Sequence, residues 1–306
     1  MALPNCCPLC QADGALQSVV TPHVYGTRTS RAAFFHCENC DVRYQYPGVT
    51  PDEEAKFYAA EFEGFMASRA GAAGGWLKAG EHVASNEPTR LRRMNYVAPH
   101  LTGRLRVLEV GCSSGFMLYP LAEAGHECTG VEPSGVFSAY VRQRGLPVYP
   151  SVEQLRESDP DTRFDIIMHF FVLEHIADPS EFLRSLLALL KPGAKIIFEI
   201  PNAADPLHTI YDIPAFERFY WSVAHPWYFS EPSLRYLLEQ SGCSYEILRD
   251  QRYDLSNHIV WARDGQPGGM GRFSEVLGPE FDQAYKQALI KSGRCDTLVG
   301  IINKDQ

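Results

Sequence analysis

The sequence predicts an α/β protein with a mostly parallel sheet of seven strands, helices on both faces, and a small cysteine-rich ribbon at the N-terminus. Two observations lead to this fold class. From residue 104 onward, strand-like and helix-like segments alternate, which is typical of a parallel sheet covered by helices. In addition, five of the nine cysteines lie in the first 40 residues, and four of these form closely spaced pairs that indicate a metal site.

Composition limits the class of protein. The chain has 306 residues, 45% of them hydrophobic, and a net charge of −9, which argues against a nucleic-acid partner because phosphate binding needs a cationic surface. The N-terminal segment lacks the basic and apolar parts of a signal peptide. The longest apolar stretch, near residues 165–173, is too short to cross a bilayer. We therefore expect a cytoplasmic protein with no membrane partner.

The ribbon is predicted over residues 1–48. "CPLC" supplies Cys7 and Cys10, and "CENC" supplies Cys37 and Cys40. Two such pairs can surround one zinc ion with four sulfurs, a closed set that is typical of a structural site. Cys6 and His36 each stand beside one of these cysteines, so either could replace a ligand. Three arginines balance three acidic residues in this region, so the ribbon itself is a poor phosphate binder.

Residues 49–103 are expected to be a helical linker. Pro51 followed by acidic residues is typical of a helix start, and a second helix is expected over 87–101. The sheet follows. Its strands are expected over 104–110, 127–133, 147–150, 164–170 and 194–201, with helices over 115–125, 134–145 and 178–193 between them. After a helix over 230–242, a hairpin of 243–250 and 257–264 is expected to complete the sheet. Residues 263–306 are expected to form a helical extension, mainly one helix over 272–292.

The stretch "RVLEVGCSSGF" at 106–116 predicts a binding loop, because small residues follow a strand abruptly. Its pattern is E-x-G-x-x-x-G, from Glu109 through Gly111 to Gly115. Glu132 ends the next strand, 21 positions after Gly111, where an acid can accept hydrogen bonds from ribose hydroxyls. A dinucleotide fold would have the glycines of G-x-G-x-x-G. This chain matches that glycine pattern only in part, which favours S-adenosylmethionine over a nicotinamide cofactor.

With the downstream stretch "FDIIMHFFVLEHIADP", residues 104–262 resemble the class I S-adenosylmethionine-dependent methyltransferases, which have a Rossmann-like sheet. The resemblance implies that the cofactor lies at the ends of the first, second and fourth strands. The residues that it implies in cofactor binding are Glu109, Gly111, Cys112, Ser113, Gly115, Glu132, Pro133, His169 and Phe170. Ser113 stands where many members have a middle glycine. His175 follows at the start of a helix-like segment, and we interpret it as structural.

The whole chain is similar to the zinc-containing sugar methyltransferases, which combine a cysteine ribbon, a helix with "FY", the methyltransferase domain and an H-x-x-x-F-S segment. This resemblance implies that Tyr58 lies near the cofactor and that residues 49–103 cover it. His225 matches the second histidine of the H-E-H-L motif of carbon-methylating members, whereas Ala224 replaces the acid. We therefore expect His225 to be the general base, with His169 as its rival.

The expected reaction is methyl transfer to a hydroxyl of a sugar, or of a nucleotide-linked or glycosylated intermediate. Carbon methylation of a sugar, RNA methylation with the ribbon as a binding module, and a non-catalytic binding role stay open as alternatives. Residues 203–230 form an insertion rich in aromatic side chains, which we interpret as a lid over a ring-shaped acceptor. Simple packing or a contact in a homodimer are the alternatives for this insertion.

Overall fold

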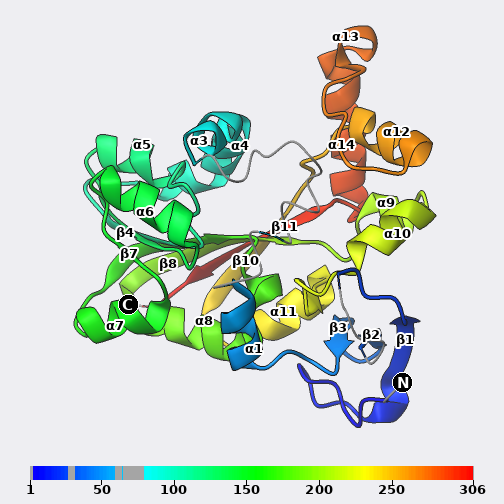
Figure 1. Cartoon of the computed structure of the whole chain (residues 1–306), viewed down its shortest axis with the longest axis horizontal. Helices are drawn as coiled ribbons and strands as arrows, with labels where there is room; N and C mark the ends of the chain where they lie inside the picture. Colours follow the sequence, from blue (N-terminus) through cyan, green and yellow to red (C-terminus); the bar gives the residue numbers. More distant parts are fainter. Residues whose placement is uncertain (1–2, 27–31, 59–63, 65–78, 306) are drawn as a thin grey trace.

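The computed structural model describes residues 3–26, 32–58, 64 and 79–305. They form two sheets, a large one with helices around it and a small one near the N-terminus (Figure 1). Among these residues no helix is long and apolar enough to pass through a membrane.

The large sheet has seven strands in the order β10-β11-β8-β7-β4-β5-β6. All neighbours pair in parallel except at β11, which is antiparallel to both of its neighbours. The strand bounds are β4 Arg106–Val110, β5 Glu127–Val131, β6 Val148–Tyr149, β7 Phe164–Phe170, β8 Leu190–Pro201, β10 Ser244–Asp250 and β11 Thr297–Asn303. The α/β class and the mostly parallel seven-stranded sheet are thus confirmed.

Helices cover both faces of this sheet, and separate hydrophobic cores lie on the two faces. The side chains alternate between the cores along each strand, as the two-residue period of a strand requires. In β7, Ile166 and Met168 lie in one core and Ile167 lies in the other. The helices that follow the strands are α5 Leu118–Glu123, α6 Gly135–Gln143, α7 Val152–Ser158, α8 Pro179–Ala188 and α11 Glu231–Glu239.

The prediction for the last strand of the sheet is wrong. Residues 257–264 belong to helix α12 (Leu255–Asp264), whose first turn is capped by Asp254. The strand that pairs with β10 is β11, beyond two more helices, α13 (Ser274–Leu277) and α14 (Pro279–Ser292). The expected helical extension over 263–306 therefore also contains a central strand. The apolar run of β11 is almost completely buried, because it lies between β8 and β10.

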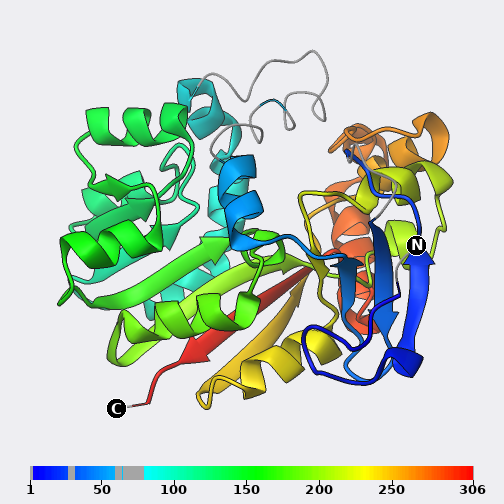
Figure 2. The ribbon, with the colours of Figure 1, turned by 60° about the horizontal axis from the view of Figure 1, so that its bottom comes forward.

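The small sheet joins the ribbon to the insertion. Strands β1 (Gln17–Thr21), β2 (Ala33–Cys37) and β3 (Arg43–Tyr46) come from the ribbon, and β9 (Trp227–Tyr228) comes from the insertion. β3 and β9 are antiparallel, with Tyr44 opposite Trp227. In both views the ribbon lies on the side of the molecule that carries α10 (Pro214–Tyr220), away from α5 and α6 (Figure 1, Figure 2). The ribbon is thus continuous with the rest of the fold.

The linker contains the helices α1 (Pro51–Lys56), α3 (Ala79–Ser85) and α4 (Glu87–Val97). Thr50 and Glu53 form a capping box at the start of α1, as the Pro51 and acidic pattern predicted. α4 is attached to the sheet through Arg93, whose Nε donates to Glu199 at the end of β8 over 2.9 Å. The covering role expected for the linker depends partly on residues 59–63 and 65–78, which lie outside the described residues.

Candidate functional site

The loop after β4 has the geometry of a cradle that only glycine can form. Gly111 and Gly115 have φ values of 72° and 77°, in the left-handed region that disfavours other residues. A Cβ atom on Gly111 would lie 2.7 Å from Cγ2 of Val172, and one on Gly115 would lie 3.0 Å from the Tyr119 ring. Ser113 adopts a φ of 50° between them. The left-handed backbone and the close approach of Val172 and Tyr119 therefore favour glycine at both positions of this loop.

Glu132 joins this loop to the end of β5. Its carboxylate accepts hydrogen bonds from the backbone N–H of Ser113 at 2.7 Å and of Ser134 at 2.8 Å. One carboxylate oxygen is thus held by the loop after β4 and the other by the start of α6. The side chain lies between the glycine loop and the start of α6, where the sequence places the ribose-binding acid. The geometry brings Glu132, Gly111, Ser113 and Gly115 together as predicted.

Of the other predicted cofactor residues, two lie on one face of the sheet below the loop, whereas one points into the core and one is exposed. Glu109 is buried below the loop, where burial raises the pKa of its carboxyl to about 8, and its Oε2 has no hydrogen-bond partner among the described residues. Phe170 lies on the same face, with Arg93 4.1 Å from its ring centroid. Cys112 points instead into the core toward Gly130, so only its backbone faces the loop. Pro133 is exposed beside Glu132.

His169 does not lie with these residues. Its side chain is fully buried between two rings, stacked on Phe198 at 4.7 Å and edge-on to Phe182 of α8 at 5.4 Å. The alternation along β7 turns His169 toward the face that α8 covers, whereas Phe170 faces the other way. Burial lowers the pKa of this imidazole to about 3. The structure therefore argues against both roles expected for His169, as a cofactor contact and as a base.

His225 lies instead in a cluster with Glu174 and His175. The rings of His225 and His175 are 4.5 Å apart, and one donor atom from each of the three residues lies within 4.8 Å of the other two. Glu174 and His175 belong to η5 (Leu173–His175), the short helical turn that follows β7. His175 Nδ1 donates to the carbonyl oxygen of Ala224 over 2.6 Å. This bond holds the segment that carries His225 against the end of β7.

Glu174 was not predicted from the sequence. Its side chain is 1% exposed, and neither carboxyl oxygen has a hydrogen-bond partner among the described residues. Burial raises the pKa of this carboxyl to about 8. The sequence "LEH" places this acid directly before a histidine. The H-E-H-L motif, however, predicts the acid directly before His225, where this chain has Ala224. The fold supplies it from another element, so a carboxyl group is present although Ala224 replaces the acid of the motif.

Tyr58 contacts the same cluster. Its ring is edge-on to His175 with centroids 5.7 Å apart. Arg252, two residues after β10, packs its guanidinium 4.1 Å from the ring centroid of Phe171, and it lowers the pKa of Glu174 against the larger effect of burial. The predicted Tyr58 thus lies beside η5, which begins shortly after the strand end at Phe170.

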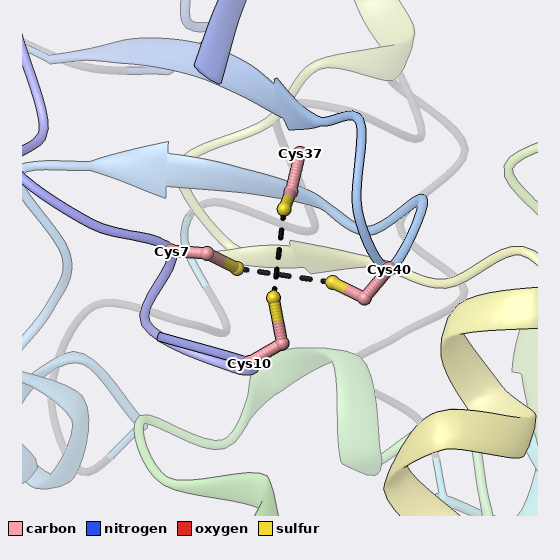
Figure 3. Close-up of side chains that lie close together, drawn as sticks. All are labelled: Cys7, Cys10, Cys37 and Cys40. Atoms are coloured by element: carbon pink, nitrogen blue, oxygen red, sulfur yellow. Dashed lines mark hydrogen bonds between the residues drawn. The ribbon is translucent and has the colours of Figure 1, made fainter. Parts of the chain in front are cut away.

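The four predicted zinc ligands converge on one point (Figure 3). The sulfurs of Cys7 and Cys40 are 3.8 Å apart and those of Cys10 and Cys37 are 3.6 Å apart. Four sulfurs placed tetrahedrally at a zinc–sulfur distance of about 2.3 Å would be about 3.8 Å apart. The spacing therefore fits a zinc ion without rearrangement.

Hydrogen bonds around the cysteine cluster support this fit. Gln17 Nε2 lies 3.5 Å from the sulfur of Cys37, and Asn39 Nδ2 lies 3.4 Å from that of Cys10, as donors to thiolates would. Neither alternative ligand takes part. The Cys6 thiol is exposed and lies 3.5 Å from Gln11 Oε1, and His36 Nε2 lies 2.8 Å from Asp41 Oδ1. The cluster therefore consists of the four cysteines that the paired spacing predicted.

The interpretation of the insertion as an aromatic lid is wrong for most of its rings. Four of them are buried in a core shared with Val24 and Phe34 of the ribbon and Trp261 of α12, and Trp227 and Phe229 are buried in one of the two cores of the large sheet. The buried rings are Phe216, Tyr220, Trp221, Trp227, Tyr228 and Phe229, all at most 8% exposed. Packing, the simpler alternative, explains them. What the insertion brings to the site is the short segment with His225, fixed in part by the Trp227 Nε1 bond to the Ile176 carbonyl oxygen over 2.9 Å.

Comparisons with known proteins agree with this geometry. A family model described as "Methyltransferase domain" matches residues 75–246. A ubiquinone biosynthesis O-methyltransferase of Bradyrhizobium sp. (strain ORS 278) is 30% identical over 51% of this chain and 67% of the relative. One of Proteus mirabilis is 34% identical over 36% of this chain, and this match spans only 48% of that relative.

Solved structures show the same fold. An S-adenosylmethionine-dependent methyltransferase from Archaeoglobus fulgidus aligns with a TM-score of 0.50 and 20% identity, over 80% of this chain and all of the other. The plantazolicin methyltransferase BpumL, in complex with SAH, aligns with a TM-score of 0.50 and 14% identity, over 83% and 94%. Together with the glycine cradle and Glu132, the family match shows that the chain belongs to the class I S-adenosylmethionine-dependent methyltransferases.

Proposed function

We propose that this protein methylates a hydroxyl oxygen of a small molecule, with S-adenosylmethionine as methyl donor and His225 as general base. The observation that carries the proposal is the position of His225, half-buried at the carboxyl edge of the sheet and fixed beside η5. S-adenosylmethionine would supply a methyl group on a good leaving group. The protein must then mainly align the acceptor and take its proton.

The residues that would bind the cofactor are those of the glycine cradle, with Glu132 toward the ribose and Glu109 below the loop. The fit rests on the left-handed glycines Gly111 and Gly115 of this loop and on the orphaned Oε2 of Glu109. Tyr58 would border the cofactor on the side of His175. In the ribbon, Cys7, Cys10, Cys37 and Cys40 would bind one structural zinc ion.

Oxygen is the proposed target because the curated relatives are named O-methyltransferases. Ala224, which replaces the acid of the motif, does not by itself exclude carbon methylation, because an oxygen of Glu174 lies within 4.8 Å of a ring nitrogen of His225. This neighbour favours carbon methylation as the second candidate, in which a base and an acid act on adjacent positions. We propose that the acceptor is a sugar, or a nucleotide-linked or glycosylated intermediate, because the whole chain resembles the zinc-containing sugar methyltransferases. The cytoplasm is the proposed location.

The test separates cofactor binding from turnover. SAH binding is measured by calorimetry, and a panel of hydroxylated acceptors is screened with S-adenosylmethionine labelled in the methyl group. Glu132→Ala should weaken SAH binding by about 1.5–3 kcal/mol. His225→Ala should keep the affinity for SAH but lower turnover about 10²–10⁴-fold. The control is His126→Ala, at the opposite end of β5. Normal turnover by His225→Ala from pH 6 to 9 would remove the base role, and NMR of the product would decide between oxygen and carbon.

A further inference from the structure

The carboxyl group of Glu174 poses a problem that the proposed reaction does not solve. It is fully buried, and neither oxygen has a hydrogen-bond partner among the described residues. A buried carboxylate is costly unless it is paired or bound to a metal, and an orphaned buried oxygen in a folded protein calls for an unseen ion or water. The neighbours of Glu174 show which kind of ligand fits.

We infer that Glu174, His175 and His225 form a binding site for a divalent transition-metal cation, separate from the four-cysteine cluster of the ribbon. Their donor atoms all lie within 4.8 Å of one another, so small side-chain adjustments would bring them to a common ion. Two imidazoles and one carboxylate leave further coordination positions open. This set is typical of ions that bind a substrate oxygen directly.

The hydrogen bond of His175 supports the assignment independently. Its Nδ1 donates to the Ala224 carbonyl oxygen at 2.6 Å, and its Nε2 lies 3.9 Å from Oε1 of Glu174. Histidines that bind metals generally donate their other ring N–H to a carbonyl or carboxylate, which fixes the tautomer. His175 therefore already has the orientation of a ligand.

The charges around the cluster permit a cation. Arg252 is the nearby positive group, and its Nε lies 3.4 Å from the buried carboxylate of Asp296, so its charge is offset. The ring of Tyr58 packs edge-on against His175 and adds no charge. An ionised Glu174 would neutralise half of the charge of a divalent ion, which would in turn remove the cost of burying this carboxylate.

The inference rests on the proposed function for the methyl transfer to a hydroxyl oxygen, but it replaces the role of His225 as general base. A cation here would bind the acceptor hydroxyl through an open position and lower its pKa, so that the proton passes to water. His225 would then be a ligand and could not act as a general base, because the ion would occupy the lone pair that a base uses to accept a proton. The roles of base and of ligand exclude each other, and metal binding decides between them.

The experiment titrates the full chain with Co²⁺ and follows the spectrum and the stoichiometry. Cobalt on thiolates absorbs strongly through sulfur-to-metal charge transfer, whereas cobalt on imidazole and carboxylate shows only weak visible bands. Two classes of site are expected in the wild type. Glu174→Gln and His225→Ala should each lower the affinity of the second class at least tenfold and leave the thiolate bands unchanged. His126→Ala should bind cobalt as the wild type does.

The inference is overturned if the wild type binds cobalt at the thiolates alone, or if both variants bind as the wild type does. His225→Ala lies in a loop and serves if Glu174→Gln does not fold. SAH calorimetry on the same samples separates the two proposals. If the protein binds SAH but has no second cobalt site, only the inferred metal site is refuted. If it has a second cobalt site but does not bind SAH, only the proposed methyl transfer is refuted.

Discussion

The Nδ1 atom of His175 lies 2.6 Å from the carbonyl oxygen of Ala224, the residue before His225. One hydrogen bond thus connects two segments that are 49 residues apart and sets the position of His225 relative to the end of β7. His175 therefore does more than begin a helix, which is the structural role that the sequence suggested for it.

Replacing His175 tests this connection. His175→Ala should destabilise the protein by about 1–3 kcal/mol, because the Ala224 carbonyl oxygen loses its donor in a buried place. His175→Asn should recover part of this loss, since its amide N–H can reach where Nδ1 donates. Thermal unfolding of the two variants measures the difference. Equal stability of both would show that the bond contributes nothing.

Gly111→Ala should disrupt the cofactor cradle. The new methyl group would meet Val172 Cγ2 at 2.7 Å, at a φ of 72°, and the left-handed conformation alone costs about 1–2 kcal/mol. We expect SAH affinity to fall at least tenfold. The matched control is Gly135→Ala at the start of α6, where an added Cβ has no neighbour within 4 Å. Similar SAH affinities for the two variants would contradict the cradle.

His169 should make the protein sensitive to acid. Its pKa is about 3 in the folded protein and about 6.5 in the unfolded chain. Between these values the unfolded state binds a proton that the folded state does not, so stability is complete above about pH 6.5 and falls by about 1.4 kcal/mol per pH unit below it. His169→Phe fits between Phe182 and Phe198 and should remove this part of the loss while SAH binding persists. Denaturant unfolding from pH 4 to 7 measures it, and parallel curves for both proteins would refute it.

Zinc should be present at one equivalent in the ribbon. Cys37→Ser should abolish it, since the cluster then keeps three sulfurs, and should increase hydrogen exchange in β2, β3 and β9 together, because β3 is the one strand of the described sheet that pairs with β9. Cys6→Ser is the matched control, because this exposed thiol lies outside the cluster. Elemental analysis that finds no zinc in fresh wild-type protein would end this prediction.

Local patterns predicted what depends on local chemistry. The paired cysteines, the glycine loop and Glu132 are all set by spacing within one or two elements. The predictions that failed have a common cause, because contacts between distant parts of the chain decide those features. "NHIVWARD" is apolar enough for a strand, but Asp254 caps it as a helix, and β11 takes the place between β8 and β10. Glu174 and His225 are brought together only by the fold, so no sequence spacing could pair the acid with the base.

The pairing of β3 with β9 has a consequence for how the chain folds. Tyr44 finds its partner Trp227 about 180 residues later, so the order of synthesis leaves β3 as an open sheet edge until the insertion has emerged. Exposed edges invite pairing with other chains, and contacts this distant in sequence form slowly. The insertion therefore closes this edge of the ribbon only at a late stage of synthesis.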